Sequence, residues 1–455
     1  MLKRTIKTFV ARLFAAPAKG PKRLGQSQHG IDPDLVSRHA FKVCEVLQQH
    51  GYEAYVVGGA VRDLIAGLEP KDFDVATNAT PEQIRPLFRR ARIIGKRFKL
   101  VHVVFGREII ETSTFRAGDT QKQQTDAHGR ILRDNEYGEL LDDVNRRDFT
   151  LNALYYDPIT EEVIDYHNGV EDLKNRVVRM IGDPETRYRE DPVRMLRALR
   201  FAAKLNASIE PQTHQPIQKL ASLITNVPES RLFDEMLKLL ECGHALRCLE
   251  QLQQEALVPY LLPFLEHSLA EPEQRLFLEI ALARTDSRVR SGRNTSPSFV
   301  FAALLWKAVQ EQCEKRIKAG SPPMQALSEA SDIVIEEQSR VLPIQRRYQG
   351  DIREIWFMQP RFERVNNRAI WRMIELPRFR AAVDFLQLRA EAKEVDSIMA
   401  QWWMDLADSQ NTETRAAMIE ARPTAPRSTS TSTRRRRAPR RRPKNTASQD
   451  TTSNE

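Results

Sequence analysis

Hydrophobic residues recur with two different periods in the first part of the chain. Apolar side chains follow helical spacing over residues 31–51, where Asp32 and Pro33 provide a helix start. Two shorter amphipathic runs, over residues 60–67 and 80–88, predict further helices. Between these runs the spacing shortens to the two-residue period of strands, so we expect helices and strands to alternate here.

Strands are predicted where a short run of β-branched and aromatic residues is bounded by glycine, proline or charged clusters. These runs cover residues 53–57, 73–77, 91–95, 100–105, 108–115, 154–157 and 161–166. The polar stretch over residues 117–135 has no period, and we expect it to be a loop.

The pattern becomes helical after residue 148. "RRDFTLNAL", residues 146–154, is expected to begin a helix, and helical spacing dominates to about residue 405. The remaining residues are mostly Pro, Ser, Thr and Arg, which cannot bury a core, so a disordered tail is expected.

We therefore predict an α+β protein: a small mixed-sheet head, then an all-α neck and body, then a disordered basic C-terminal tail. The predicted domains are a basic N-terminal arm over residues 1–30, the head over 31–180, neck helices over 181–245, a helical body over 246–405 and the tail over 406–455.

The composition limits the class of protein. The chain has 455 residues, of which 41% are hydrophobic, and no apolar run is long enough to span a membrane. Arg12 interrupts the apolar core that a secretory signal would need, and the four cysteines are scattered, so we expect a cytoplasmic protein with reduced thiols. The net charge of +9 indicates a polyanionic partner, most commonly nucleic acid.

Two carboxylates, Asp72 and Asp74, lie one residue apart in the second predicted strand. Alternate residues of a strand point to the same face, so both would project together while Phe73 and Val75 pack below. Like charges this close repel each other, and a cation between the two carboxylates would explain why the chain tolerates this arrangement. Hard oxygen ligands favour Mg²⁺, and two such ions ~3.5–4 Å apart can activate a hydroxyl and neutralise a leaving pyrophosphate. A solvated edge strand is the alternative for an isolated pair of this kind.

A Gly-Gly turn precedes this pair of carboxylates. Gly58 and Gly59 allow backbone N–H groups to approach a phosphate, and the following helix adds its positive end. Arg62 can bind a phosphate through two hydrogen bonds. Alone, such a turn is an ordinary connection between a strand and a helix. Followed by a strand with two aspartates, it predicts a phosphate cradle beside a metal site.

Arginines and aspartates gather at two later helix starts. Arg146 and Arg147, at the predicted start of a helix that contains Asn152, would repel its positive end unless an anion lies among them. In "EDPVRMLRAL", Asp191 can cap a helix, and together with Arg194 it can read the edge of a base. Ordinary ion pairs are the alternative in both segments.

These motifs, in this order, resemble the nucleotidyltransferase superfamily that joins bacterial poly(A) polymerases with class II CCA-adding tRNA nucleotidyltransferases. The resemblance is carried by "GGAVRDLIAGLEPKDFDVATNATPEQI", "RRDFTLNALYYD" and "RYREDPVRMLRALRFAAKL", within residues 50–245. It implies a polymerase-β-like head in which Asp72 and Asp74 bind two Mg²⁺ ions and form the catalytic group together with Asp148. The nucleotide-binding residues that it implies are Gly58, Gly59, Arg62, Asp63, Arg146, Arg147, Asn152, Asp191 and Arg194.

Two positions remain open within this resemblance. Relatives have two glycines where this chain has Asn168-Gly169, and because Asn tolerates left-handed backbone angles we expect the turn to survive. The third carboxylate is Asp148 by resemblance, whereas Glu111, on a neighbouring predicted strand, is the geometric alternative.

"IIGKRFKLVHVV", residues 93–104, resembles the segment that marks the poly(A) polymerase branch, and Lys96 and Arg97 form a basic turn that we expect to contact RNA. No His-Asp dipeptide occurs, so the phosphohydrolase domain of many CCA-adding relatives is missing. Arginines in the tail can neutralise RNA phosphates, although a run of this kind can also be merely solvated. The tail residues expected to bind RNA are Arg434, Arg435, Arg436, Arg437, Arg440, Arg441 and Arg442.

The sequence therefore predicts a poly(A) polymerase that adds AMP from ATP to RNA 3′ ends without a template, with Mg²⁺ as cofactor. CCA addition to tRNA by the same chemistry is the first alternative, and a non-catalytic RNA-binding adaptor is the second. The resemblance also implies an Sm-like RNA chaperone and RNA-decay ribonucleases as partners, in mRNA processing and RNA decay.

Overall fold

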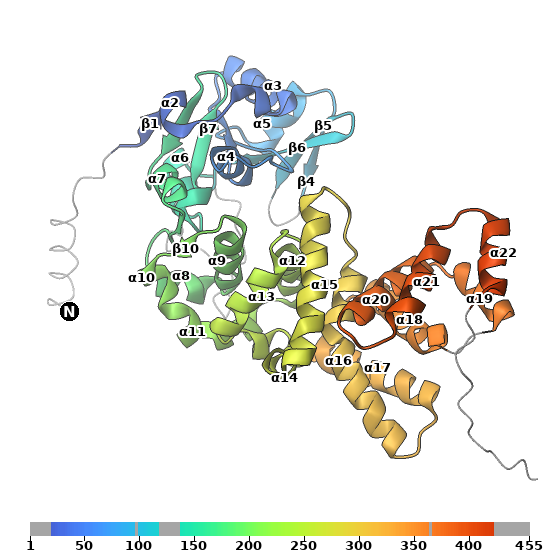
Figure 1. Cartoon of the computed structure of the whole chain (residues 1–455). Coiled ribbons are helices and arrows are strands. Elements are labelled where there is room, and N and C mark those ends of the chain that lie inside the picture. Colours follow the sequence, from blue (N-terminus) through green and yellow to red (C-terminus); the bar gives the residue numbers. More distant parts are fainter. Residues whose placement is uncertain (1–19, 96–98, 118–136, 364–365, 423–455) are drawn as a thin grey trace, which may run out of the picture. The chain divides into compact units, whose positions relative to one another are not determined.

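The computed structural model describes residues 20–95, 99–117, 137–363 and 366–422 (Figure 1). The chain divides into two compact units, residues 1–407 and 408–455, and all described strands belong to the first. The first nineteen residues of the predicted arm, Lys96 and Arg97 of the basic turn, most of the predicted loop over 117–135 and the tail arginines from Arg434 to Arg442 lie outside the described residues.

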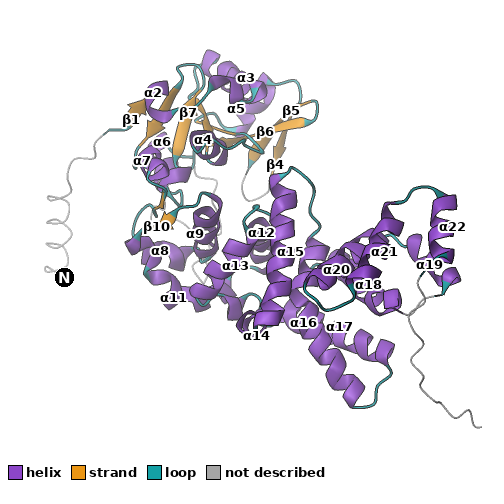
Figure 2. Cartoon of the chain, in the orientation of Figure 1, coloured by secondary structure: helices purple, strands orange, loops and turns teal. Residues whose placement is uncertain are grey.

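An eight-stranded mixed sheet forms the head, which contains nearly all of the strand structure of the described chain (Figure 2). The strand order is β1-β8-β7-β2-β3-β6-β5-β4. The β3 and β6 strands pair in parallel, and the other neighbours pair antiparallel. The strands are β1 (Lys22–Leu24), β2 (Ala54–Val57), β3 (Asp74–Thr77), β4 (Ala91–Ile94), β5 (Leu100–Phe105), β6 (Glu108–Thr114), β7 (Leu154–Asp157) and β8 (Glu162–Asp165).

One face of the sheet is packed against helices along its whole width. The helices α3 (Arg38–Gln49), α4 (Gly59–Ile65) and α5 (Pro81–Ile84) share an apolar core with alternate residues of the strands, from Val163 on β8 to Val103 on β5. The opposite face has a smaller core, which includes Val57, Tyr155 and Val144 of α6 (Leu140–Asn145). The predicted small mixed sheet flanked by helices is thus confirmed.

Two predicted boundaries in the head are wrong. The helix expected to begin at Asp32 begins after Ser37, whose side chain accepts hydrogen bonds from His39 N and Ala40 N, while Asp32 caps only a single 3₁₀ turn. The predicted arm also extended too far, because β1, within residues 20–30, pairs with β8 and completes the sheet.

The helix α7 (Gly169–Lys174) and a small parallel pair of strands lead from the head to the neck, which contains α8 (Pro184–Glu190) and α9 (Val193–Lys204). The core of the neck reaches back to Phe149 and Leu151 of the head and forward into the body. The paired strands are β9 (Val177–Val178) and β10 (Ser208–Ile209), and the other neck helices are α10 (Pro211–His214), α11 (Pro216–Leu220) and α12 (Glu229–Leu240). The helices α13 (Ala245–Gln254) and α14 (Leu265–Ala270) lead from the neck into the body.

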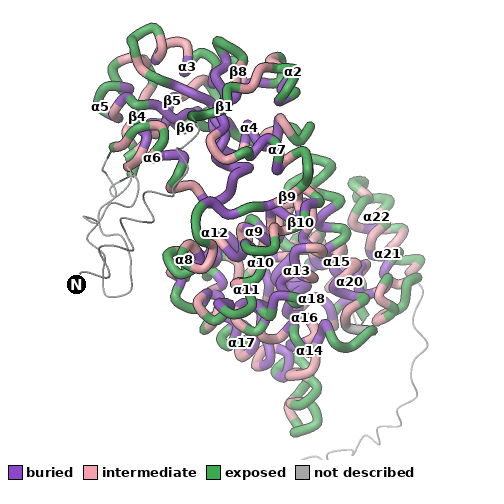
Figure 3. Tube along the Cα trace, turned by 90° about the vertical axis from the view of Figure 1, so that its left-hand side faces the viewer, coloured by how far each residue is buried: buried purple, intermediate pink, exposed green. Residues whose placement is uncertain are grey.

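The body is all helical, as predicted, and its buried residues gather along its central helices (Figure 3). Trp356 is fully buried there and donates a hydrogen bond to Ala302 O at 3.0 Å. The body helices are α15 (Pro272–Arg290), α16 (Pro297–Lys318), α17 (Pro323–Val341), α18 (Arg346–Glu363), α19 (Asn367–Ile374), α20 (Phe379–Glu391) and α21 (Ser397–Asp408). The second unit contains α22 (Thr412–Glu420).

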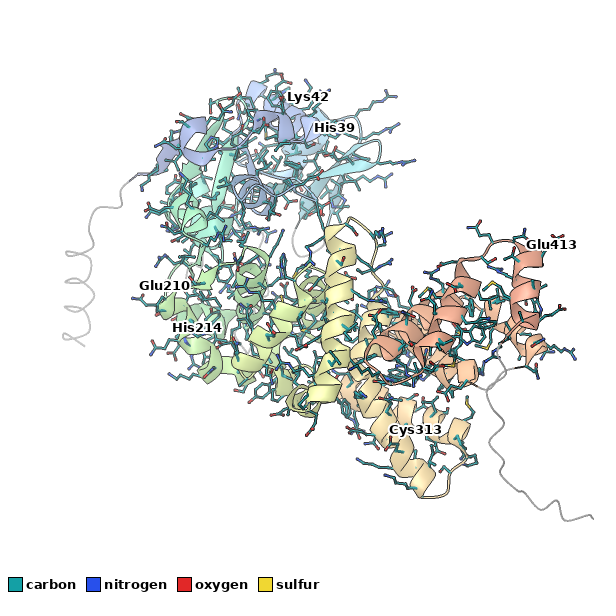
Figure 4. The ribbon with its side chains drawn as sticks, in the orientation of Figure 1. His39, Lys42, Glu210, His214, Cys313 and Glu413 are labelled. Atoms are coloured by element: carbon teal, nitrogen blue, oxygen red, sulfur yellow. The ribbon has the colours of Figure 1, made fainter. Side chains whose placement is uncertain are left out.

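Several polar clusters away from the carboxylate-bearing strands serve the fold. His39 and Ser37 both bind the Glu108 carboxylate, Glu210 accepts a hydrogen bond from Thr213 N and so caps α10, and His214 Nε2 lies 2.6 Å from Glu255 Oε1 (Figure 4). The four cysteines are free thiols, as expected. Among the described helices, none combines the length and apolarity that a membrane crossing requires.

The turn at Asn168-Gly169, where relatives have two glycines, forms as predicted. Asn168 adopts φ 61° and ψ 32°, in the left-handed region, at the N-cap of α7. Gly169 cannot carry a side chain, because an added Cβ would lie 2.2 Å from Thr150 O and 2.8 Å from Thr150 C, both backbone atoms.

We expect Gly169→Ala to destabilise the protein by about 1–3 kcal/mol, as overpacking against fixed backbone does. Asn168→Gly is the matched control at the neighbouring position and should change stability by less than about 1 kcal/mol, because glycine adopts the same backbone angles freely. Thermal unfolding of the two variants is the measurement. Equal unfolding midpoints would show that the turn relaxes to admit the Cβ.

Candidate active site

Three carboxylates meet on one face of the head sheet. Asp74 is the first residue of β3, and Asp72 precedes it by two residues. Glu111 on β6 is the register partner of Asp74, so the two side chains lie on the same face, one strand spacing apart. Partial desolvation, and then the charges of Glu111 and Asp72, raise the pKa of Asp74 to about 6. The three groups therefore carry an excess of negative charge at one place.

The donor atoms of these side chains are of the kind that binds a divalent cation, but in the described residues no three Asp, Glu, His or Cys side chains are already gathered around one ion position. The carboxylates of Asp72, Asp74 and Glu111 are all in exposed positions, so they can be reached from solvent. Oxygen ligands with uncompensated negative charge are what Mg²⁺ binds in proteins, usually together with substrate phosphates. Burial first, and then the charges of Glu111 and Asp72, raise the pKa of Asp74, and a bound cation would favour its ionised form.

The Gly-Gly turn lies next to these carboxylates and takes the predicted form. Gly58 has φ 69°, a left-handed angle, and a Cβ there would come 3.3 Å from Nη1 of Arg147. Gly59 opens α4, and Val57, the last residue of β2, pairs with Asp74. The turn is thus placed beside these carboxylates by strand pairing, as the motif order implied.

Arg62 is buried beneath the site, with 6% of its surface exposed. Its guanidinium donates to Asp63 Oδ1 at 2.9 Å and to Asn152 Oδ1 at 2.8 Å, and it stacks over the Phe201 ring at 4.8 Å. All its described partners are protein groups. The structure therefore gives Arg62 a role in connecting α4 to the residues behind the site.

The predicted helix start at Arg146 is wrong. Arg146 is the C-cap of α6, and only one 3₁₀ turn, η3 (Thr150–Asn152), follows. Phe149 is extended because it bridges Met180, so a helix cannot continue through it. The arginines consequently lie at the negative end of a helix, where their charge is favourable.

The anion among these arginines is Asp143, a residue that the sequence reasoning missed. Arg146 Nε donates to Asp143 Oδ1 at 2.9 Å, Arg147 Nη2 donates to Oδ2 at 3.1 Å, and the Tyr155 hydroxyl also donates to Oδ2. Burial alone would raise the pKa of Asp143, but Arg147, Arg146 and the Tyr155 hydroxyl lower it to about 2. The spacing of an acid three and four residues before two arginines was the available signal.

Asp148 is buried, and both of its carboxylate oxygens accept hydrogen bonds from protein groups. Oδ1 accepts hydrogen bonds from Phe149 N at 2.8 Å and from Asn152 Nδ2 at 3.1 Å, and Oδ2 accepts from Arg197 Nε at 2.6 Å. Burial opposes ionisation, but Arg197 and these hydrogen bonds lower the pKa of Asp148. Asp148 thus remains ionised and joins the head to α9 of the neck.

The two residues expected to read a base, Asp191 and Arg194, lie in the neck. The helix there begins one residue later than predicted. Pro192, not Asp191, is the N-cap of α9, because Asp191 ends α8 in an extended conformation. The Asp191 carboxylate instead binds Arg231 Nη2 at 2.9 Å, while its Oδ1 is buried without a hydrogen-bond partner among the described residues. Arg194 donates to Glu190 Oε2 at 2.9 Å and to Arg187 O at 2.7 Å.

A stripe of basic residues on α9 faces this region. Arg197 and Arg200 lie over the Phe201 ring at 5.4 and 4.5 Å, so that ring is contacted by three guanidiniums, including that of Arg62. Lys204 donates to Asp63 Oδ2 at 2.7 Å and thereby ties the neck to the head. Sequence reasoning did not single these residues out, although basic side chains every three to four positions predict one face of a helix.

Comparison with known proteins gives the family. Sequence profiles described as "Poly A polymerase head domain", "Probable RNA and SrmB- binding site of polymerase A" and "Polymerase A arginine-rich C-terminus" match residues 54–179, 206–269 and 319–442. Poly(A) polymerase I of Salmonella typhi is 42% identical over 429 residues, which are 91% of this chain and 92% of that one. The CCA-adding enzyme of Geobacillus stearothermophilus is 37% identical, but over only 49% of this chain and 54% of its own.

The fold has solved relatives. The structure of the Thermotoga maritima CCA-adding enzyme complexed with tRNA_CCA aligns with a TM-score of 0.56 at 18% identity, over 90% of this chain and 92% of that one. A mixed-sheet head with paired carboxylates beside a Gly-Gly turn, on a helical neck and body, defines a nucleotidyltransferase of the superfamily that the motifs indicated. Within it, the chain belongs to the poly(A) polymerase I family, since the match to the Salmonella enzyme spans nearly the whole of both chains. It is a polynucleotide adenylyltransferase that binds RNA and a nucleoside triphosphate.

Loss of the Asp143 charge should destabilise the head. Asp143→Asn leaves two arginine charges beside a buried neutral amide, and breaking a buried ion pair in this way costs about 3 kcal/mol. Asp142→Asn is the control, because it removes the same charge from a more exposed neighbour while keeping the oxygen that caps α6. The measurement is thermal or denaturant unfolding of both variants.

The pH dependence of this difference follows from the lowered pKa. A carboxyl whose folded pKa lies below its unfolded value of ~3.9 stabilises the protein above that value and loses this contribution as the pH falls through the folded pKa. The folded pKa of Asp143 is about 2. The gap between wild type and Asp143→Asn should therefore stay constant between about pH 5 and pH 8. A gap that shrinks in this range would contradict the ion-pair account.

Proposed function

We propose that the chain adds AMP from ATP to RNA 3′ ends, without a template, at the carboxylates Asp72, Asp74 and Glu111. The observation that carries this proposal is the parallel register of β3 and β6, which sets Asp74 beside Glu111. Burial, and then the charge of Glu111, raise the pKa of Asp74. Family membership supports the reaction type. The register supports Glu111 as the third carboxylate of the site.

These carboxylates would hold Mg²⁺, in a two-ion arrangement. When bound, Mg²⁺ lowers the pKa of an attacking hydroxyl and neutralises the charge of a departing pyrophosphate. Asp74 and Glu111 project side by side from the sheet, and Asp72 adds a third donor at the end of β3. An RNA 3′-hydroxyl that attacks the α-phosphate of ATP must therefore be brought to the place where these carboxylates lie.

The residues around the carboxylates position the nucleotide. Gly58 and Gly59 allow the triphosphate to approach the backbone, and Arg146, whose side chain is 29% exposed, is the arginine of α6 most open to solvent. Arg62, Asp63 and Asn152 act behind them, because their hydrogen bonds hold α4 against η3 and α9.

Asp148 is best explained as a positioning residue. Its carboxylate is held by Asn152 and Arg197 and is largely buried, which favours a structural contact over a metal ion. By keeping Arg197 and Asn152 in place, Asp148 aligns the neck with the head.

Asp191 and Arg194 would select the adenine base from the neck. The unpartnered Oδ1 of Asp191 supports this proposal, since buried acceptors without a donor are rare and a base amino group could supply one. Glu190 and Arg187 O hold the Arg194 side chain from two sides. A site that pairs with one base leaves groups unpaired when another base enters, at about 1–3 kcal/mol each.

The domain plan and the setting of the reaction are part of the proposal. We place the head before residue 180, the nucleotide-reading neck before about residue 245 and the RNA-binding body after it, with the arginine-rich tail as a further RNA contact. The family resemblance supports action in the cytoplasm, in mRNA processing and RNA decay, with an Sm-like RNA chaperone and RNA-decay ribonucleases as partners.

Product length tests the proposed function. With ATP alone and an unstructured RNA primer, we expect a ladder of long adenylate tails, because nothing in the described site is dedicated to stopping after a few additions. CTP should be a poor substrate, and tRNA should have no advantage. Gel analysis of products with each nucleotide offered alone is the measurement. Addition of only a few residues, with CTP required first and only on tRNA lacking its 3′ end, would establish CCA addition instead.

The third carboxylate can be identified by two substitutions. Glu111→Gln removes a charge from an exposed side chain, so we expect extension to fall at least ~100-fold, about 2.7 kcal/mol of lost barrier reduction, with the unfolding midpoint unchanged. Asp148→Asn should lower the midpoint, because it leaves Arg197 without its buried partner. If Glu111→Gln extends RNA like wild type while Asp148→Asn folds normally and is inactive, the two roles are exchanged.

A further inference from the structure

A single cross-strand row runs from the carboxylates to the edge of the sheet. Asp74 pairs in register with Glu111, Glu111 with His102 on β5, and His102 with Arg92 on β4. Register partners lie on the same face of a sheet, so these four side chains share the face that carries the carboxylates. Strands are spaced ~4.8 Å apart, which places Arg92 ~14 Å from Asp74 along the row.

One link of this row, between Glu111 and His102, is a direct contact. His102 Nε2 lies 3.3 Å from Glu111 Oε1, which continues the chain of polar groups outward from the site. The side chain of His102 is 24% exposed. Arg92, at the outer end, is exposed and has no ion-pair partner among the residues that the structure describes.

This half of the face is open, whereas the other half is covered. Over β2, β7 and β8, the same face is packed beneath Val144 of α6 and the rest of the smaller core. Over β4 and β6, it presents Ile94 and Ile109 with 41% and 46% of their surface exposed, and no described helix packs on them. The carboxylates lie at the boundary between the two halves.

The remaining arginines near β4 separate into two groups. The Arg90 carbonyl accepts a hydrogen bond from Val104 N, so the pairing with β5 continues to this residue. Because side chains alternate between the faces of a strand, the Arg90 side chain is expected on the same face as that of Arg92. Arg85 and Arg89 instead line a hollow with Phe88, Ala91 and Ile93. Ala91 and Ile93 pack against the helix-covered core, so this hollow belongs to the other side of the strand.

We infer that the open half of this face, with Arg92 and Arg90 at its rim, binds the last nucleotides of the RNA strand whose 3′ end lies at the carboxylates. The inference rests on the proposed function, and it assigns the surface to which the RNA, the second substrate, binds. The row is continuous with the carboxylates, so a strand along it has its 3′ end at Asp74 and Glu111.

Charge and apolarity together select single-stranded RNA as the occupant. Arg92 and Arg90 offer positive charge to phosphates, while Ile94 and Ile109 offer an apolar surface to bases, which suits a strand whose bases are unpaired. A bare anion would need only the arginines. ATP would have to reach the row from the other side of β3, where the Gly-Gly turn follows β2.

The test compares Arg92→Gln with Arg89→Gln. Both remove one exposed arginine from the same short segment, but only Arg92 lies on the open face. We expect Arg92→Gln to raise the KM for a short oligoadenylate primer roughly 3- to 10-fold, as loss of one charged hydrogen bond does. The slope of log primer affinity against log salt should become shallower by about 0.7, the value for one phosphate contact on a single strand.

The control and a second readout make the outcome decisive. Arg89→Gln should leave the primer KM and the salt slope as in wild type, and the KM for ATP should be unchanged in both variants. Equal primer KM and salt slope in Arg92→Gln, Arg89→Gln and wild type would overturn the inference. A rise in the KM for ATP alone would assign the row to the nucleotide and overturn it too.

Failure of the proposed function would be seen separately. If wild type extends no primer with ATP, the proposed function fails, and primer binding by fluorescence anisotropy still compares the two arginine variants. Matching thermal unfolding midpoints would show that neither substitution acts through the fold.

Discussion

A buried ionic network between the head and α9 is the interaction on which the site depends. Arg62 on α4 binds Asn152, Asn152 binds Asp148, and Asp148 binds Arg197 on the neck helix. Lys204 adds a second connection through Asp63. Removing charges from water is costly unless each is paired and hydrogen-bonded, and here Asp148 is paired with Arg197 directly and connected to Arg62 through the neutral Asn152 amide. The network therefore fixes the Gly-Gly helix, the η3 turn and the neck in one arrangement.

The sheet contributes a different constraint, which is register. Parallel pairing of β3 with β6 brings Glu111 beside Asp74, although 37 residues separate them in sequence, and antiparallel pairing continues the row to His102 and Arg92. A slip of one residue would turn each of these side chains to the opposite face. The apolar core against α3, α4 and α5 prevents such a slip, because Val75, Ile110 and Val103 must stay inside it. Packing on one face thus sets the chemistry of the other.

Local sequence signals predicted which helices, strands and turns occur better than they predicted where these elements begin and end. The capping box at Thr80 and Gln83 and the left-handed turn at Asn168 occur as expected, since both depend on neighbouring residues only. The ends of other elements shifted where a distant contact intervened. The Phe149 bridge to Met180 limits the expected helix to one 3₁₀ turn, and pairing of β1 with β8 draws part of the expected arm into the sheet.

The sequence by itself determined the order of the motifs, the α+β class and the superfamily, because glycine turns, paired aspartates and helical periods are local patterns of residue type. It also predicted two aspartates at the start of a strand, and the structure places Asp74 first in β3 and Asp72 two residues before it. Only the tertiary structure decided the partners: Asp143 as the anion between Arg146 and Arg147, Asp148 as a buried link to Arg197, and Glu111 as the neighbour of Asp74. The physical reason is that the role of a charged side chain depends on the groups that surround it. Burial and register join residues far apart in the chain, and these determine which carboxylates are satisfied by arginine and which remain exposed.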